Sequence, residues 1–337
     1  EPMNVPPGAD RPWSPNSPPS PGAPSGRDHR RRWIVLGVSF AVVVAVVVGS
    51  LVWRGVSTRN DADNASAAVG DGVDRTVGLL RDKDPVCDEW TRFADELSKN
   101  EEQWASSNRG IPASKWTPEQ QEIFTSAGEA MTRAADQFES ILPKARNVVI
   151  QELMAQTIVY LRAYVERIPA YVGSDGLIAG VAGNFSNAVT YMCSAVPLVP
   201  SGGEADLSSV QEPAELKAFM EVADPVCDEF VALADRQNSA LIGWAVTDST
   251  IPSAQWTPEQ RSLFDAVRKT ITRDLVRFRE IADEAKGRVM GDLVATQNAY
   301  MEAFADAIPS YTPDDAQIWT AVTSFGGGLA AACEAQW

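Results

Sequence analysis

An internal repeat constrains the fold of this chain more than any other feature of its sequence. Residues 84–89, Asp-Pro-Val-Cys-Asp-Glu, recur at 224–229, and the offset of 140 residues then holds without a gap to the end of the chain. Further pairs in this register are Trp104 and Trp244, Trp116 and Trp256, Tyr171 and Tyr311, and Cys193 and Cys333. Coincidence does not produce such a register, so the sequence indicates a tandem duplication.

Helix-start signals recur in both copies. Residues 117–120, Thr-Pro-Glu-Gln, form a capping box with proline at the first helical position, and residues 257–260 repeat it letter for letter. Asp84-Pro85 and Asp224-Pro225 each place a good N-cap residue before a proline. The Asp-Pro pairs predict the start of a first helix in each copy, and in the first copy this helix runs from Pro85 to about Trp104. The capping boxes predict the start of a second helix in each copy.

An apolar stripe with helical spacing follows each capping box. In the first copy it runs from Phe124 to Ile168 without a cluster of turn residues, which predicts either one long bent helix or two shorter ones. A last helix, about Gly176 to Cys193 or Pro313 to Cys333, closes each copy. The Gly326–Gly328 run predicts local flexibility or close packing. Since no segment shows sustained strand-like alternation, the predicted fold class is all-α, with two tandem, homologous bundles of three or four helices.

Four cysteines fall at matching places in the two copies. Three pairings are possible, but an equal span of 106 residues in each copy favours Cys87 with Cys193 and Cys227 with Cys333. Each bond would join the first helix of a copy to its last, and closing a loop of this size is worth roughly 4 to 5 kcal/mol in the chain-entropy model. Free buried thiols are the alternative. Metal binding is disfavoured, because the cysteines lack short spacing and histidine neighbours.

Residues 33–53, WIVLGVSFAVVVAVVVGSLVW, form an uncharged apolar run with a tryptophan at each end. This run predicts an N-terminal transmembrane helix. A cleaved signal peptide is the alternative, since Ala65-Ser66-Ala67 resembles a cleavage site, but that site lies far beyond the run. Arg27 and Arg30–Arg32 precede the run, so the positive-inside rule predicts a single-pass protein of the cytoplasmic (inner) membrane, with a cytoplasmic N-terminus and extracytoplasmic C-terminal domains.

The predicted organisation has six parts. They are a disordered Pro-rich cytoplasmic tail (1–32), the transmembrane helix (33–53), a stalk (54–80), the first helical domain (81–196), a linker (197–213) and the second helical domain (214–337). The tail, the arginine cluster and the Val/Ala-rich run together resemble many uncharacterised single-pass envelope proteins of actinobacteria. This resemblance is compositional, covers about the first 55 residues and implies no activity.

The charge of the chain limits its partners. Residues 60–337 carry 22 Lys and Arg against 42 Asp and Glu. Nucleic acids and anionic headgroups need clustered cations, so an acidic surface disfavours both. The sequence predicts a membrane or envelope protein as partner, with a lipid as the alternative and no nucleic acid.

Catalytic chemistry is restricted by the near absence of histidine. The only one, His29, precedes the apolar run, and neither a Walker loop nor a Rossmann glycine pattern occurs, so no cofactor is predicted. Asp88 with Glu89, and Asp228 with Glu229, are candidate carboxylates for glycan cleavage. Their place in the first turn of a helix has a simpler explanation in the helix dipole.

Two repeated aromatic residues are the candidates for binding. Trp116 and Trp256 precede the capping boxes, and the residues that would staple them to the helix are polar, so the indoles pack elsewhere. Each covers the end of its bundle, or the two form equivalent partner or ligand sites. The same two interpretations apply to Tyr171 and Tyr311.

These observations predict a membrane-anchored, non-enzymatic accessory, sensing or protein-binding module of the cell envelope. An extracytoplasmic carrier of a lipid or another apolar ligand is the alternative. A glycan-cleaving enzyme that uses carboxylates is the third hypothesis.

Overall fold

The computed structural model describes residues 77–199 and 216–335, which belong to one compact unit of the chain, Ser66–Trp337. Within these ranges the regular structure is helical and no β-strand occurs, so the all-α part of the predicted fold class is confirmed. The predicted tail, the transmembrane segment and most of the stalk and linker lie outside the described ranges. The predicted domain boundaries stay predictions.

The predicted membrane topology is not supported by the structure. Within the two described ranges, no helix combines the length and the apolar character that crossing a bilayer requires. The fold class is therefore corrected to all-helical over the described residues, and the predicted N-terminal transmembrane helix is no longer part of it. The predicted single-pass localisation in the cytoplasmic membrane is withdrawn with it. Both predictions depended on residues 33–53, which lie outside the described ranges.

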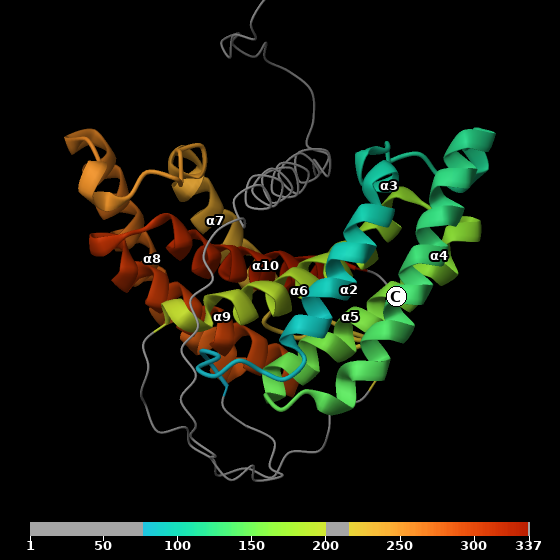
Figure 1. Cartoon of the computed structure of the whole chain (residues 1–337), viewed down its shortest axis with the longest axis horizontal. Coiled ribbons are helices and arrows are strands. Elements are labelled where there is room, and N and C mark those ends of the chain that lie inside the picture. Colours follow the sequence, from blue (N-terminus) through green and yellow to red (C-terminus); the bar gives the residue numbers. More distant parts are fainter. Residues whose placement is uncertain (1–76, 200–215, 336–337) are drawn as a thin grey trace, which may run out of the picture. The chain divides into compact units, whose positions relative to one another are not determined.

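The first copy contains four long helices and one short helix (Figure 1). They are α2 (Cys87–Asn100), α3 (Glu102–Ser106), α4 (Pro118–Ile141), α5 (Val148–Arg167) and α6 (Gly176–Ala195). The second copy contains α7 (Cys227–Ala245), α8 (Pro258–Glu284), α9 (Arg288–Ala307) and α10 (Ala316–Glu334). The second copy has no separate counterpart of α3, because α2 ends at Asn100 whereas α7 continues past the matching residue, Ala240, to Ala245.

Both capping boxes form as predicted. The Thr117 hydroxyl accepts a hydrogen bond from the Gln120 backbone N–H, and the Gln120 side-chain oxygen accepts one from the Thr117 backbone N–H. Thr257 and Gln260 make the same pair of bonds. Because each partner lies within four residues, the sequence alone determines where α4 and α8 begin.

Asp84 does more than the sequence predicted. The first helix begins at Cys87 rather than Pro85, with Val86 at the N-cap position. The Asp84 carboxylate accepts the predicted type of local bond from the Val86 N–H (3.1 Å), and it also accepts from the backbone N–H groups of Arg146 (2.8 Å) and Asn147 (2.8 Å). The carboxylate therefore ties the start of the first copy to the connection between α4 and α5.

The second copy repeats this arrangement. Asp224 accepts from the backbone N–H groups of Val226 (3.2 Å), Lys286 (2.9 Å) and Gly287 (2.7 Å). The same connections settle the choice between one bent helix and two. The chain leaves the helix at Ala145 and Ala285, so α4 and α5, like α8 and α9, are separate helices.

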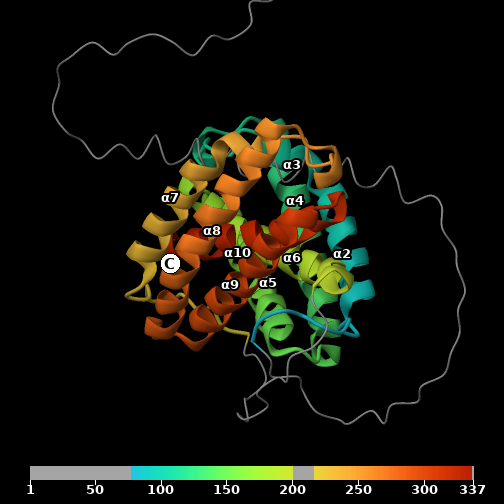
Figure 2. The same cartoon turned by 90° about the vertical axis from the view of Figure 1, so that its left-hand side faces the viewer.

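The two copies meet through their last helices. Contact between α6 and α10 is the most extensive of any helix pair in the described chain, and the two lie side by side (Figures 1 and 2). Glycines of α10 permit the close approach: a Cβ added at Gly327 would lie 2.7 Å from Asn184 Oδ1, closer than van der Waals contact allows. A Cβ at Gly328 would overlap the ring of Phe185. The glycine run of α10 thus serves close packing.

The segment before each bundle packs on the other copy. The Leu80 N–H donates to the Tyr300 hydroxyl on α9 (3.2 Å). Reciprocally, Gln156 on α5 donates to the Lys217 carbonyl (2.9 Å) and accepts from the Phe219 N–H (3.0 Å). The copies are therefore joined by exchanged lead-in segments as well as by α6 and α10.

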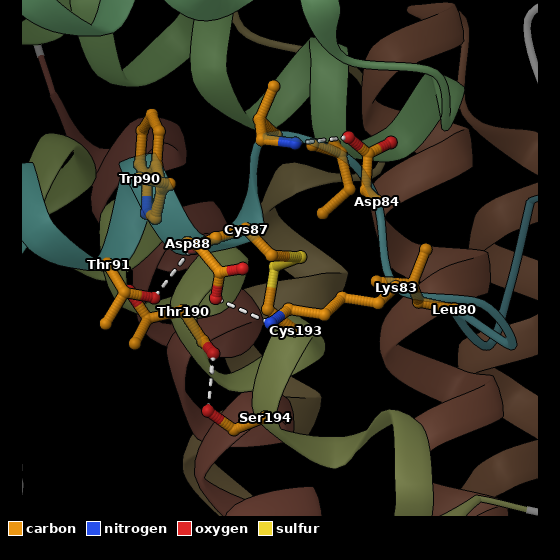
Figure 3. Close-up of a disulfide and its surroundings, with 12 residues drawn as sticks. Leu80, Lys83, Asp84, Cys87, Asp88, Trp90, Thr91, Thr190, Cys193 and Ser194 are labelled. Atoms are coloured by element: carbon orange, nitrogen blue, oxygen red, sulfur yellow. Dashed lines mark hydrogen bonds and ion pairs between the residues drawn. A yellow bond between two sulfur atoms is a disulfide. The ribbon is translucent and has the colours of Figure 1, made fainter. Parts of the chain in front are cut away.

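Each copy has its own disulfide, as predicted. Cys87 is bonded to Cys193 and Cys227 to Cys333, with Cα–Cα distances of 5.7 and 5.4 Å. Figure 3 shows the first bond joining the start of α2 to the end of α6. The Thr91 hydroxyl donates to the Cys87 carbonyl beside it (2.9 Å). Each bond closes its bundle by linking the first helix to the last.

Candidate functional site

The predicted binding residue Trp116 lies in an aromatic cluster at the end of the first bundle. Its ring centroid is 4.1 Å from that of Phe124 and 5.5 Å from that of Tyr171. The indole N–H donates to the Ile111 carbonyl (2.8 Å), and the Tyr171 hydroxyl donates to the Arg109 carbonyl (2.6 Å). Trp116 is half-buried and Tyr171 is buried. The polar atoms of both side chains are thus bonded to the loop that they cover.

The second copy builds the same cluster from Trp256, Phe264 and Tyr311. The Trp256 ring centroid lies 3.8 Å from that of Phe264 and 5.6 Å from that of Tyr311. Trp256 donates to the Ile251 carbonyl (2.9 Å) and Tyr311 to the Ser249 carbonyl (2.8 Å). Burial raises the pKa of the Tyr311 hydroxyl well above its ordinary value. These contacts give the four residues a packing role, while their binding of a partner stays a prediction.

A polar cluster next to Trp116 exists in the first copy only. The Trp104 indole N–H donates to the Tyr164 hydroxyl (2.9 Å), and the Arg109 guanidinium lies 4.7 Å from the Trp104 ring centroid. Glu101 Oε1 is buried without a hydrogen-bond partner, and burial raises the pKa of this carboxyl to about 8. At the matching positions the second copy has Leu241, Ser249 and Phe304. Its bundle therefore folds without these polar groups.

Three of the four candidate catalytic carboxylates form ion pairs, and the fourth, Asp228, is exposed. Asp88 pairs with Lys83 (2.5 Å) and Glu89 with Lys144 (2.8 Å). Glu229 pairs with Arg277, whose hydrogen bonds hold the pKa of Glu229 below its ordinary value. A general acid for glycan cleavage needs the opposite shift.

Two further predictions concern ligand sites. In the described ranges, no three His, Cys, Asp or Glu side chains are grouped so that they could hold a metal ion. A hollow of about 480 Å³ along α4 is lined by Pro118, Gln121, Glu122, Thr125, Ser126 and Glu129. Because this lining is mostly polar, the hollow gives the lipid-carrier hypothesis no support.

A buried acid lies between the copies. Glu152 on α5 accepts a hydrogen bond from Arg288 on α9, and Arg288 also donates to Asp292 (3.1 Å). Asp292 is the counterpart of Glu152 in the repeat register, so equivalent positions of the two copies meet here. Burial, and then the neighbouring Asp292, raise the pKa of Glu152 above its ordinary value. Sequence reasoning missed this group, because only the pairing of the copies brings it together.

The sequence analysis also missed an exposed apolar surface on α7. Ile242 is 66% exposed and Val246 is 82% exposed. The signal was available in the repeat register, since the matching residues of the first copy are Glu102 and Ser106. A polar-to-apolar difference between two copies of one fold marks a surface that folding does not explain.

Fold and surface together define a duplicated, disulfide-linked, all-helical protein whose two copies pack into one unit. A family model described as "Mycobacterial ESX-1 associated protein" matches residues 73–337, which include both copies. The chain therefore belongs to the Mycobacterial ESX-1 associated protein family.

One relative has the same extent. The chain is 26% identical over 345 aligned residues to an uncharacterised protein of Mycolicibacterium smegmatis (strain MKD8). The alignment covers 96% of this chain and 90% of that protein. No solved structure shows a significant match. Both matches are mycobacterial, so the predicted likeness to actinobacterial proteins is confirmed at that level, although the sequence reasoning named no family.

Proposed function

We propose that this chain is a non-enzymatic accessory protein of the ESX-1 secretion system, in which the two-copy helical unit binds other proteins of that system. The family match over both copies carries the proposal. It spans the packed copies together, which supports assigning the ESX-1 association to the unit formed by α2 to α10.

The geometry supports a binding role over an enzymatic one. Glu89 and Glu229, at matching positions of the two copies, both form ion pairs with cationic side chains, and the repeated aromatic side chains bond to their own loops. What the unit offers is a stable scaffold: two disulfides, a glycine-lined contact between α6 and α10, and exchanged lead-in segments. Such a scaffold presents surfaces in a fixed relation, which suits an accessory that holds partners.

Deletion of the gene in a mycobacterial host tests the proposal. We expect the amount of ESX-1 substrates in the culture filtrate to fall, while proteins exported by other routes stay constant, as measured by quantitative mass spectrometry. The full chain should restore secretion. A variant with Glu89 and Glu229 changed to glutamine should restore it equally well, because no catalysis by these groups is proposed. Unchanged secretion after deletion, or failure of this variant alone, would contradict the proposal.

A further inference from the structure

A stripe along one side of α7 lies open to solvent. Ser239, Ile242 and Gly243 lie in α7, and Val246 is the C-cap residue directly after it; their spacing of i, i+3, i+4 and i+7 places them along one side of the helix, and all four are exposed. We call these four residues the α7 stripe. The Ser239 hydroxyl donates to the Asp235 carbonyl of the same helix (2.8 Å), which leaves Ile242 and Val246 as the main features of the surface.

The first copy shows that folding does not require this stripe. Its matching residues are Lys99, Glu102, Gln103 and Ser106, and all four are polar and exposed. Both copies nevertheless keep the same following helices, the same capping boxes and the same disulfide. Ile242 and Val246 therefore leave apolar surface in water without a packing reason among residues 77–199 and 216–335.

The shape of the stripe fits another helix. Nothing lies within 4 Å of the place where a Cβ at Gly243 would be, so a partner backbone can approach between Ile242 and Val246. Two large side chains one turn apart, with a small residue beside them, provide the ridge and the groove into which a second helix packs.

Charges beyond the ends of the stripe indicate what the second helix carries. Asp235 lies one turn before Ser239, with the exposed Arg236 beside it, and Asp248 lies two residues after Val246; both carboxylates are exposed. Neither forms an ion pair within the described ranges. Hydrogen bonds from Thr250 hold the pKa of Asp248 below its ordinary value, so it is ionised at neutral pH. The chain as a whole has a formal net charge of −16, so a second copy would be repelled from this surface.

We propose that the α7 stripe is a docking surface for an amphipathic α-helix of a different protein, with apolar residues on one face and Lys or Arg near both ends. This inference rests on the proposed function, since it names the surface through which the chain holds a protein partner. The apolar face of the partner covers Ile242 and Val246, and its basic ends meet Asp235 and Asp248.

The first test uses the full chain and a defined probe. The probe is a fluorescent 18-residue helical peptide with leucines at i, i+3, i+4 and i+7 and lysines at both ends, and its control has glutamates in place of the lysines. The variant Ile242→Glu/Val246→Ser carries the first copy's own residues, so it should keep the thermal unfolding and both disulfides of the parent chain. The matched control is Glu102→Gln/Ser106→Ala on the first copy.

We expect fluorescence anisotropy to show binding of the lysine peptide to the parent chain and to the matched control with affinities within twofold. The α7 variant should bind at least tenfold more weakly, and the glutamate peptide should bind none of them. Equal binding by the parent chain and the α7 variant, equal binding of both peptides, or no binding at all would overturn the proposal.

The second test places a photocrosslinking amino acid at position 242 of the full chain in a mycobacterial host, with position 102 as the control. We expect an adduct from position 242 alone, with the crosslinked peptide mapping to a helix that has an apolar stripe and basic ends. An adduct with a second copy, with a lipid or with an acidic segment overturns the proposal, as does no adduct.

The secretion role and the docking surface can be tested independently of each other. If gene deletion abolishes ESX-1 secretion while position 242 gives no adduct, the proposed function stands and the docking surface is wrong. If position 242 captures a basic amphipathic helix while secretion survives the deletion, the surface stands and the secretion role is wrong.

Discussion

A glycine-to-alanine change has opposite expected effects at two helical positions of this chain. Alanine at Gly328 would place a Cβ against the ring of Phe185, a fully buried side chain across the contact between α10 and α6. Alanine at Gly243, on the open side of α7, would meet no atom within 4 Å. Both substitutions reduce the backbone freedom of the unfolded chain equally, so their difference reports the packing between the two copies.

The magnitudes follow from these contacts. Alanine is favoured over glycine inside a helix by roughly 0.8 to 1 kcal/mol. Gly243→Ala should raise the free energy of unfolding by roughly 0.5 to 1 kcal/mol. Gly243 lies in the last turn of α7, and the added methyl group meets no neighbouring atom. Gly328→Ala adds a methyl group to a filled core, which typically costs about 1 to 3 kcal/mol. The gain in helix propensity offsets part of this cost, so we expect Gly328→Ala to lower the free energy of unfolding by up to about 2 kcal/mol.

Urea unfolding of the oxidised chain, followed by tryptophan fluorescence and circular dichroism, measures both free energies. The parent chain is the reference, and non-reducing mass spectrometry checks that both disulfides remain. If Gly328→Ala proves as stable as Gly243→Ala, then α6 and α10 do not approach as described, and the glycine run has another purpose.

Three further changes have expected outcomes. Asp84→Ala removes the acceptor of the Arg146 and Asn147 backbone N–H groups and leaves them without a hydrogen-bond partner. The free energy of unfolding should therefore fall by roughly 2 to 4 kcal/mol in urea titrations. A loss under 1 kcal/mol would show that Asp84 does not have this role. Changing Cys87 and Cys193 together to alanine opens a loop of 106 residues and should cost about 4 to 5 kcal/mol in the same assay; an unchanged midpoint would contradict the entropic argument. The pKa of Glu101 is raised from 4.5 to about 8, so the folded state holds a proton that the unfolded state releases, and stability should fall as pH rises from 4.5 to 8, by up to ~1.4 kcal/mol per pH unit. Glu152, whose pKa is also raised, contributes a slope of the same sign, so Glu101→Leu, the residue of the second copy, should reduce the slope in unfolding curves at pH 5 to 8.5 without removing it; an unchanged slope would refute the assignment.

Local signals in the sequence were reliable where their partners are close along the chain. The starts of α4 and α8 follow from Thr117 and Thr257, because a capping box needs only its own first turn. Asp84 looked like an N-cap for the same reason, but its carboxylate reaches the α4–α5 connection about 60 residues away. A local sequence pattern cannot show that a side chain also bonds to backbone groups far along the chain.

Other features depend on how the copies pair, and periodicity does not encode that. The apolar stripe continues from α4 into α5, so spacing alone could not reveal the break at Ala145. The disulfides could be predicted, because equal spans in two copies select one pairing. The burial of Tyr171 and Tyr311 could not, since a repeated tyrosine has the same pattern whether it packs or binds.

The α7 stripe occupies an intermediate position. Ile242 and Val246 look like ordinary apolar residues of an amphipathic helix when the second copy is considered by itself. Comparison with Glu102 and Ser106 separates them from the core, but only the structure shows that they face solvent.

The exchanged lead-in segments affect what happens when the copies are produced separately. A single copy keeps the segment that should cover its sister, and it keeps an uncovered Tyr300 or Gln156 of its own. Two identical molecules can satisfy both needs by exchanging segments with each other, as the copies do within one chain. An isolated copy should therefore purify as a homodimer, and tethering two copies in one polypeptide turns a concentration-dependent assembly into one that forms at any dilution.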